Sequence, residues 1–418
     1  MTASVRFVHA ADLHLAAPFK GVDAADPRVR DALVRSTYEA LEALVDVCLA
    51  REVDFLVLAG DVYNSAERSL TAEAAFRRAC ERLAEAGIGV YVAHGNHDPA
   101  GGRTHRLDLP GIVHVFSASE VERVVFERDG EAVCALYGRS YRTSAETGNL
   151  ARGFVRDASD PLSIGVLHAN VGGRPGHEPY APCSVDDLRA AAMDYWALGH
   201  IHKAEVISED PAIVYAGCTQ GLQPNESGLK GCRVVTLTPA GAEIESVPTS
   251  AVVWSTAEVD VTDVDGIADV ERALAQAVAR AAADAEGRPV VLRAVLTGRA
   301  PVHADLVRPA ALKELSSEVR AAALERSPWV WVDRVTDRTR PVVDLDALRS
   351  SELLAGDVVR IADTLAADMA ALEALVAEVS GPVLGALDRA EVAEPDAAAL
   401  LERARDIVLD RLLAGEDA

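Results

Sequence analysis

The sequence has no uninterrupted apolar stretch long enough to span a membrane, and no apolar signal region precedes its first predicted strand. Its six cysteines form no C-x-x-C pair, a pattern typical of reduced core residues rather than of a zinc site or disulfide framework. Basic residues are outnumbered, since 41 Lys and Arg face 65 Asp and Glu, for a net charge of −24. We therefore expect a cytoplasmic protein with no membrane partner. Because its overall field repels polyanions, DNA contact would need a local basic patch, bound metals or a partner.

The chain is long enough for two or three domains, with 418 residues of which 50% are hydrophobic. Residues 1–250 alternate β-rich runs with helical periodicity, which predicts an α/β domain. Residues 251–342 show a shorter strand–helix pattern and predict a small α+β capping domain that could contact DNA. Residues 343–418 predict an acidic helical tail for partner docking or dimerisation.

The boundaries of the main elements can be predicted from these patterns. We expect strands over residues 5–10, 54–59, 88–93, 163–168 and 195–198, and helices over residues 31–50 and 69–86. Ser184 and Asp187 predict the capped start of a helix that runs to residue 192. In the tail, we expect the helical pattern to break at Gly356, Gly381–Pro382 and Pro395.

Five short segments rich in Asp, His and Asn each follow a predicted strand. They are Asp12-Leu13-His14, Gly60-Asp61, Gly95-Asn96-His97-Asp98, His168 and Gly199-His200-Ile201-His202. Because strand ends converge in α/β folds, we expect these segments to meet in one pocket. Together they offer seven oxygen and nitrogen ligands and one spare His, enough to hold two divalent metals with one bridging carboxylate. Two metals roughly 3.5–4 Å apart favour in-line attack on a phosphoester.

The spacing within the segments supports this interpretation. Asp12 and His14 are two residues apart, and in an extended stretch both side chains would point the same way; His200 and His202 repeat that spacing. Asp61 follows an apolar run, where a carboxylate is costly unless cations compensate its charge. Mixed Asp and His ligands favour Mn, Fe, Zn or Co over Mg or Ca. The glycines at the strand ends are expected to permit tight turns.

These segments resemble the five signature motifs of the calcineurin-like metallophosphoesterases, over roughly residues 4–250. The resemblance implies a two-sheet αββα sandwich that holds two metals, with Mn²⁺ expected, and a metal-activated hydroxide as the nucleophile. It assigns Asp12, His14, Asp61 and His202 to one metal, and Asp61, Asn96, His168 and His200 to the other. It also implies that His97 protonates the leaving oxygen or stabilises the transition state, and that Asp98 orients His97 or a ligand.

Longer segments resemble the bacterial DNA repair exonucleases of the SbcD and YhaO type. They are residues 9–21, 195–203, 215–221 and 226–231, and the loop over residues 172–182 favours the YhaO branch. The resemblance implies a phosphodiesterase that acts on DNA ends, with an SMC-like ATPase of the SbcC or YhaN type as partner of the helical tail. One departure is Asn64, where such nucleases often carry a His, because Asn cannot titrate near pH 7.

Two other hypotheses stay open. A small-molecule phosphodiesterase or phosphatase would suit the acidic charge, although it has little use for the C-terminal third of the chain. An interaction adaptor with a vestigial metal site would suit the helical tail, although the ligand set is intact. The tail could also form a homodimer, and the basic residues between Arg288 and Arg326 could follow a DNA backbone.

Overall fold

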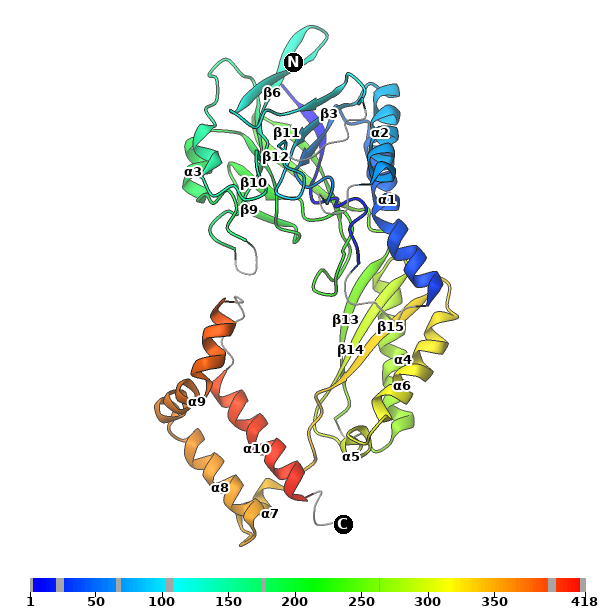
Figure 1. The fold of residues 1–418 in the computed structure, drawn as a ribbon, viewed down its shortest axis with the longest axis vertical. Helices are drawn as coiled ribbons and strands as arrows, with labels where there is room; N and C mark the ends of the chain where they lie inside the picture. Colours follow the sequence, from blue (N-terminus) through cyan, green and yellow to red (C-terminus); the bar gives the residue numbers. More distant parts are fainter. Residues whose placement is uncertain are drawn as a thin grey trace. The chain divides into compact units, whose positions relative to one another are not determined.

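The computed structural model describes residues 3–19, 26–64, 69–101, 108–174, 178–262, 264–389 and 396–413 (Figure 1). The chain divides into two compact units. The first contains Met1–Thr256, Arg280–Arg293 and Ala323–Asp333, and the second contains Ala257–Ala279, Ala294–Ala322 and Arg334–Ala418. The division of the chain into domains at residues 250 and 342 stays a prediction.

The first sheet has six strands in the order β12–β11–β1–β2–β3–β4 (Figure 1). They are β1 (Val5–Ala10), β2 (Phe55–Ala59), β3 (Gly89–Ala93), β4 (Val113–Val115), β11 (Gly231–Thr238) and β12 (Gly241–Pro248). Strands β1 to β4 run parallel, and β11 lies antiparallel between β1 and β12. Because β1, β2 and β3 are parallel neighbours, the loops that carry Asp12, Asp61 and Asn96 leave the same edge of the sheet.

The second sheet also has six strands, in the order β5–β6–β7–β8–β10–β9. They are β5 (Glu122–Arg128), β6 (Glu131–Arg139), β7 (Ser163–His168), β8 (Tyr195–Gly199), β9 (Glu205–Glu209) and β10 (Ala212–Tyr215). Strands β6, β7, β8 and β10 are parallel, with β5 and β9 antiparallel at the edges. His168 pairs in register with Gly199, so the last residue of β7 lies beside the start of the His200 loop.

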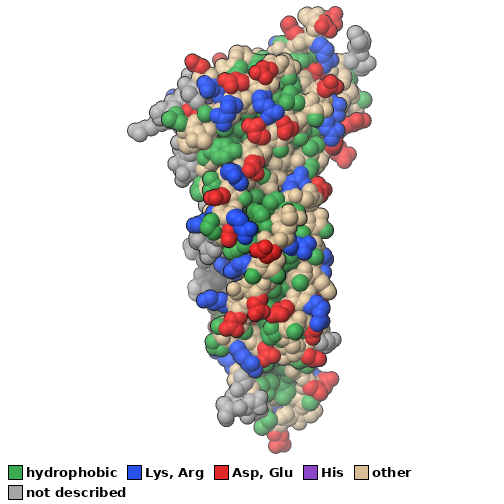
Figure 2. All heavy atoms as spheres, turned by 90° about the vertical axis from the view of Figure 1, so that its right-hand side faces the viewer, with side chains coloured by type: hydrophobic (Ala, Val, Ile, Leu, Met, Phe, Trp, Pro, Cys, Tyr) green, Lys and Arg blue, Asp and Glu red, His purple; other side chains and the backbone are tan. Residues whose placement is uncertain are grey.

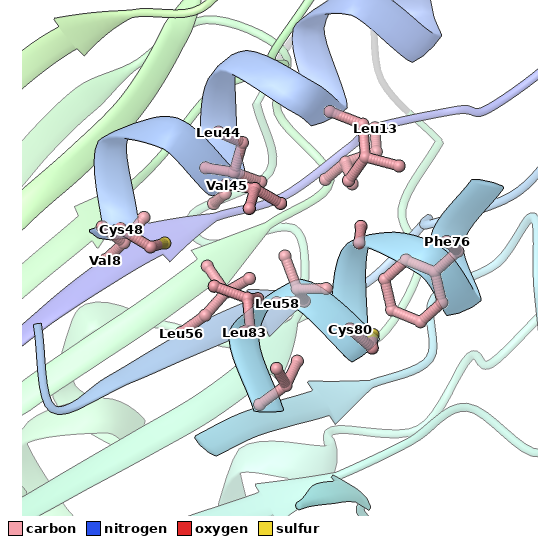
Figure 3. Close-up of a cluster of buried hydrophobic side chains, with 14 of the residues drawn as sticks. Val8, Leu13, Leu44, Val45, Cys48, Leu56, Leu58, Phe76, Cys80 and Leu83 are labelled. Atoms are coloured by element: carbon pink, nitrogen blue, oxygen red, sulfur yellow. The ribbon is translucent and has the colours of Figure 1, made fainter. Parts of the chain in front are cut away.

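Three apolar layers hold these sheets together. Between the sheets lies a cluster that includes Phe7, Phe55, Ile164 and Val214. The opposite face of the first sheet is covered by helices α1 (Pro27–Ala50) and α2 (Leu70–Glu85), whose Leu44 and Phe76 pack with strand residues such as Val8 and Leu56 (Figure 3). The short helix α3 (Val185–Ala190) and the 3-10 turn Leu150–Gly153 cover the second sheet. The predicted αββα sandwich is therefore confirmed.

Helix starts in this region follow from local sequence. Asp26 accepts a hydrogen bond from Arg28 N at the start of α1, where Pro27 occupies a position that needs no N–H donor. Ser69 caps α2 by accepting from Ala72 N. The predicted capping box of Ser184 and Asp187 is present at α3, although that helix ends at Ala190.

The remaining elements begin with a small parallel sheet in the order β13–β14–β15. Its strands are β13 (Val253–Asp260), β14 (Val290–Thr297) and β15 (Val330–Asp337), joined through α4 (Ile267–Asp284), α5 (His303–Leu306) and α6 (Ala311–Leu324). Four helices follow: α7 (Leu345–Arg349), α8 (Leu354–Ala366), α9 (Met369–Arg389) and α10 (Ala397–Leu413). The predicted breaks at Gly356 and Gly381–Pro382 are wrong, since α8 and α9 run through them; Pro395 lies outside the described residues.

Among the described residues, no helix combines the length and apolar character needed to cross a membrane. The surface carries charges of both signs. On the face drawn in Figure 2, Lys and Arg side chains are interspersed with Asp and Glu. Some ion pairs join two residues of one helix near the surface, such as Arg35 with Glu39 and Arg77 with Glu81. Pairs of this kind add little stability, so the acidic excess acts mainly through the net field.

His9 is a fully buried imidazole on β1, in the layer between the two sheets. Its Nδ1 lies 3.1 Å from the Tyr195 hydroxyl and its Nε2 lies 3.2 Å from the Leu198 carbonyl oxygen. Burial lowers the pKa of His9 from 6.5 to about 3. The folded chain therefore holds a neutral imidazole that becomes protonated on unfolding at mildly acidic pH.

We predict that this histidine makes the fold less stable as the pH falls from 6.5 towards 3. The pKa of His9 is lower in the folded chain than in the unfolded chain, so its full contribution to stability is present above pH 6.5. Lowering the pH to 5 should remove about 2 kcal/mol from the free energy of unfolding. The measurement is the free energy of unfolding at pH 7 and pH 5 for the wild type and His9→Asn. The difference between the two pH values should shrink by that amount in the variant. Tyr195→Phe, which keeps the imidazole, should retain the wild-type pH dependence.

Candidate metal centre

The structure brings all seven predicted ligand residues to one edge of the sandwich, at or just beyond the C-terminal ends of five parallel strands. Five of the side chains are buried and two are partly exposed. The seven are Asp12 and His14 after β1, Asp61 after β2, Asn96 after β3, His168 at the end of β7, and His200 and His202 after β8. Their ring nitrogens and carboxylate oxygens form several groups in which all ligand atoms lie within 4.8 Å of one another.

One group of polar atoms surrounds the imidazole of His202. Its Nε2 lies 3.1 Å from His14 Nε2 and 3.9 Å from Asp12 Oδ1. Its Nδ1 lies 2.8 Å from a carboxylate oxygen of Glu226, so Nδ1 carries the proton and Nε2 presents a lone pair to the centre. Sequence reasoning assigned no role to Glu226, although it lies in the segment 226–231 on which the resemblance depends. Two imidazole nitrogens and a carboxylate that face one another form a set suited to a cation.

A second group meets at the side-chain oxygen of Asn96. This oxygen lies 3.0 Å from His168 Nε2 and 3.3 Å from His200 Nδ1. The other nitrogen of each ring is 2.9 Å from a backbone carbonyl, that of Ala59 for His168 and that of Glu178 for His200. Carbonyl oxygens only accept, so each ring donates its N–H away from the centre. When the His168 ring is neutral, three lone pairs converge, and a cation would satisfy all of them.

Asp61 lies between these two groups. Its Oδ2 is 3.8 Å from His14 Nε2 in the first group and 3.4 Å from His168 Nε2 in the second. Burial alone would raise the pKa of Asp61, but the charge and hydrogen bond of His168, together with the charges of His14 and His97, hold that pKa well below its usual range. A carboxylate that stays ionised at this depth needs positive charge on both sides, which two cations would supply.

The loop backbones at the centre adopt strained conformations. Asp12, His14, Asp61 and His200 have φ values of 52°, 43°, 54° and 96°, in a region that side chains with a Cβ rarely occupy. The extended stretch predicted for Asp12 and His14 is therefore wrong. Both side chains reach the centre because their backbone N–H groups donate to the carbonyls of Gly60 and Asp61, which ties the β1 loop to the β2 loop.

Three glycines let the loops approach the ligands closely. A Cβ on Gly60 would lie 2.3 Å from His168 Nδ1, one on Gly95 would lie 2.3 Å from Asp61 Oδ1, and one on Gly199 would lie 2.0 Å from the Ala59 carbonyl oxygen. Only Gly60 of the three also has a positive φ, of 99°. The predicted role in tight turns thus fits Gly60, whereas Gly95 and Gly199 are needed for space.

The spare histidine, His97, lies beside the first group and is partly exposed. Its ring meets that of His14 edge to face, with 4.7 Å between centroids, and its backbone N–H donates to Asp61 Oδ1 at 2.9 Å. Its Nδ1 lies 3.3 Å from Asn64 Oδ1, so the residue that departs from the nuclease pattern contacts the predicted catalytic imidazole. An amide at this position can orient the ring but cannot exchange a proton with it.

Asp98 has a different set of contacts. Its buried carboxylate accepts hydrogen bonds from the backbone N–H groups of Val62 and Gly95, at 2.9 and 2.8 Å, and lies 3.3 Å from His94 Nδ1. These bonds join the loop after β2 to the loop after β3, so Asp98 holds the backbone that carries Asp61. The catalytic role predicted for Asp98 stays a prediction.

We predict that Gly95→Ala weakens metal binding by roughly tenfold or more, because the new methyl group displaces the Asp61 carboxylate. The measurement is the rise in melting temperature when manganese is added to chelator-treated protein, followed over a range of metal concentrations. Gly111→Ala is the matched control, since a Cβ at Gly111 meets no atom within 4 Å. Equal metal affinities in the two variants would contradict the close-approach role of Gly95.

We also predict that metal binding at pH 8 releases roughly one proton. In the metal-free chain, burial would lower the pKa of His168, but the Asp61 carboxylate raises it to about 9, so the ring is protonated at pH 8. A metal needs the neutral ring, so metal affinity should rise with pH up to about pH 9. The measurement is titration calorimetry in Tris and in HEPES, whose protonation enthalpies differ. Identical binding enthalpies in the two buffers would rule out proton release.

Comparisons with known proteins identify the family of this chain. A family model described as calcineurin-like phosphoesterase matches residues 5–204, and one described as metallophosphoesterase YhaO, middle domain, matches residues 254–340. A solved structure of a dimetal phosphatase from Danio rerio is similar with a TM-score of 0.33 and 12% identity, covering 60% of this chain and 100% of that chain. That similarity is too low to support an argument about this chain.

Three curated relatives are similar in sequence. The uncharacterized metallophosphoesterase YhaO of Bacillus subtilis is 36% identical over 349 residues, which cover 83% of this chain and 85% of that protein. The DNA double-strand break repair protein Mre11 of Thermoplasma acidophilum is 27% identical over 50% of this chain and 58% of its own length. The SbcD component of the nuclease SbcCD of Escherichia coli is 24% identical over 58% of this chain and 67% of its own length. The chain belongs to the calcineurin-like metallophosphoesterases of the YhaO type, which are related to the Mre11 and SbcD nucleases.

Proposed function

We propose that this protein is a dimetal phosphodiesterase that cleaves DNA at its ends in repair. The observation that carries the proposal is the meeting of two groups of lone pairs at one buried carboxylate, Asp61. Such an arrangement fits two divalent cations that share a ligand, with Mn²⁺ the metal we expect from the mixed Asp and His donors. When bound, two such cations activate a water molecule near neutral pH and polarise the phosphoester.

We assign the ligands as the sequence predicted them. Asp12, His14, Asp61 and His202 would hold one metal, and Asp61, Asn96, His168 and His200 would hold the other. The backbone carbonyls of Ala59 and Glu178 and the carboxylate of Glu226 fix three of the imidazole rings, so the lone pairs are aimed before a metal arrives. Preorganisation of this kind lowers the cost of binding.

His97 is the residue we propose as proton donor to the leaving oxygen. Its ring is partly exposed beside the first group of ligands, where a bound phosphoester would be within reach, and the Asn64 side chain contacts its Nδ1. The Asp61 carboxylate accepts a hydrogen bond from the His97 backbone N–H, which ties the loop that carries the proposed proton donor to the proposed bridging ligand. General acid catalysis by a positioned histidine typically contributes roughly 10²–10⁴-fold to rate.

DNA is the substrate we favour because of two relatives, one named as a DNA double-strand break repair protein and the other as part of a nuclease. We further propose that the helices over residues 343–418 bind an SMC-like ATPase. In support, α8, α9 and α10 expose large apolar side chains: Leu354, Ile361, Met369, Val379 and Ile407. Apolar groups presented this way suit a protein partner.

We predict that the full-length chain with manganese degrades end-labelled linear DNA, and that His97→Ala loses this activity by roughly 10²–10⁴-fold. The same variant should lose less activity on bis(p-nitrophenyl) phosphate, because p-nitrophenolate leaves without much help from an acid. Asp61→Asn should lose activity on both substrates. The measurement is the initial rate on each substrate for each protein, with His114→Ala as a histidine control outside the centre.

The outcomes separate the competing functions. Hydrolysis of bis(p-nitrophenyl) phosphate without DNA cleavage would show a working metal site, and the substrate would then be a small phosphodiester or DNA delivered by the ATPase. Full DNA cleavage by His97→Ala would remove this residue from the mechanism. No hydrolysis of either substrate in the wild type would favour an adaptor with a vestigial site.

A further inference from the structure

A pocket of about 420 Å³ opens beside His202, within the first unit of the chain. Its walls come from the segment after β8, the segment after β10, the start of β11 and the end of β12. His202 both lines this pocket and offers its Nε2 to the candidate metal centre. A ligand bound in the pocket and a group bound at the centre would therefore both lie against His202.

The pocket gathers cationic side chains in an acidic protein. The whole chain has only four lysines, at a net charge of −24, and two of them, Lys203 and Lys230, line this pocket. Arg233 is the third cation. Glu286 is the sole carboxylate among the lining residues, and it is 61% exposed and paired with Arg288 at 3.4 Å. The local charge of the pocket is thus opposite to that of the protein as a whole.

These three cations have no carboxylate partner within ion-pair distance among the described residues. Some other basic residues of the same unit are paired, such as Arg51 with Glu245 at 2.6 Å and Arg174 with Glu205 at 2.8 Å. Arg233 lies on β11 opposite His9 and is partly buried, and its Nε has no hydrogen-bond partner in the described part of the chain. An unpaired and partly desolvated guanidinium destabilises the fold, unless an anionic ligand pairs with its charge and accepts its hydrogen bonds.

We propose that this pocket binds a backbone phosphate of the nucleic-acid strand whose neighbouring phosphodiester lies at the metal centre. The proposal rests on the proposed nuclease function and extends it to a second contact with the same strand. The fork of a guanidinium matches phosphate oxygens, and two ammonium groups add point charges that can follow them. Such contacts hold the strand in position and read no bases, so we expect binding without sequence preference.

The pocket cations also offset the repulsion that the net charge of the protein exerts on a nucleic-acid strand. An overall charge of −24 repels a polyanion at long range, and only a local excess of cations close to the centre can reverse that repulsion. Within the Debye length of roughly 8 Å at physiological salt, the pocket cations dominate over acidic groups elsewhere on the surface. The strand would then be held at short range, next to His202.

The test is the double variant Lys203→Gln/Lys230→Gln in the full-length chain with manganese. The first measurement is fluorescence anisotropy with a labelled, nuclease-resistant phosphorothioate single strand over a series of salt concentrations. We expect Kd to rise at least tenfold, and the slope of log Kd against log salt to fall by about 0.7, the value for one lost phosphate contact on a single strand. The second measurement is cleavage of a normal strand, where the loss should exceed that on bis(p-nitrophenyl) phosphate at least tenfold.

Two further variants serve as controls. Arg35→Gln/Arg77→Gln removes the same charge from α1 and α2, whose arginines do not line the pocket, and should keep the wild-type Kd and slope. Lys230→Arg should retain binding, since it keeps the charge. Unchanged melting temperatures with and without manganese would show that each variant folds and keeps its metal centre.

Two outcomes would overturn the proposal in different ways. Equal Kd and equal salt slope in the wild type and in Lys203→Gln/Lys230→Gln would overturn the phosphate pocket and leave the nuclease function in place. A wild type that hydrolyses bis(p-nitrophenyl) phosphate but neither binds nor cuts the strand would overturn the nuclease function together with the pocket.

Discussion

The buried carboxylate of Asp61 is the group on which the rest of the candidate metal centre depends. It stays ionised where water is excluded, which is costly unless positive charge lies close on both sides. His14 belongs to the first group of ligands and His168 to the second, and a ring nitrogen of each faces the Asp61 carboxylate, at 3.8 and 3.4 Å. The αββα sandwich supplies what this requires, because parallel strands of two sheets end at one edge and present ligands at or just beyond five strand ends.

The loops bear a conformational cost for this arrangement. Four of the candidate ligands lie on a backbone with positive φ, and each such position costs on the order of 1–3 kcal/mol. Hydrogen bonds between the loops, including those accepted by Asp98, hold the strained backbone in place. Glycines at the points of closest approach remove the side chains that would collide. The site is therefore organised before any metal binds, and its rigidity comes from the strands behind it.

The net charge of the whole chain and the local charge of the pocket beside His202 have opposite signs. The chain as a whole is strongly acidic, which suits solubility and disfavours nonspecific contact with nucleic acid. Beside His202, half of the lysines of the chain and an unpaired arginine line a single pocket. A protein of this kind would bind a nucleic-acid strand where the metals and the pocket cations act together. The place of binding on the surface would then be set by the metal centre and the pocket, and not by the net charge of the protein.

Much of this could be predicted from the sequence, because hydrophobic periodicity and the Asp, His and Asn clusters are local features. Strand β7 is found over residues 163–168 as predicted, and the five clusters do meet at one edge. The left-handed backbone of Asp12 and His14, the space that Gly95 and Gly199 provide, and the contact of Glu226 with His202 could not be predicted. Each depends on a distance between segments far apart in the chain, such as the 2.3 Å between a Cβ on Gly95 and Asp61. The sequence by itself determined which chemical groups are present and which strands present them. Only the tertiary structure decided which lone pairs converge, because convergence requires two sheets to pack with their strand ends in register.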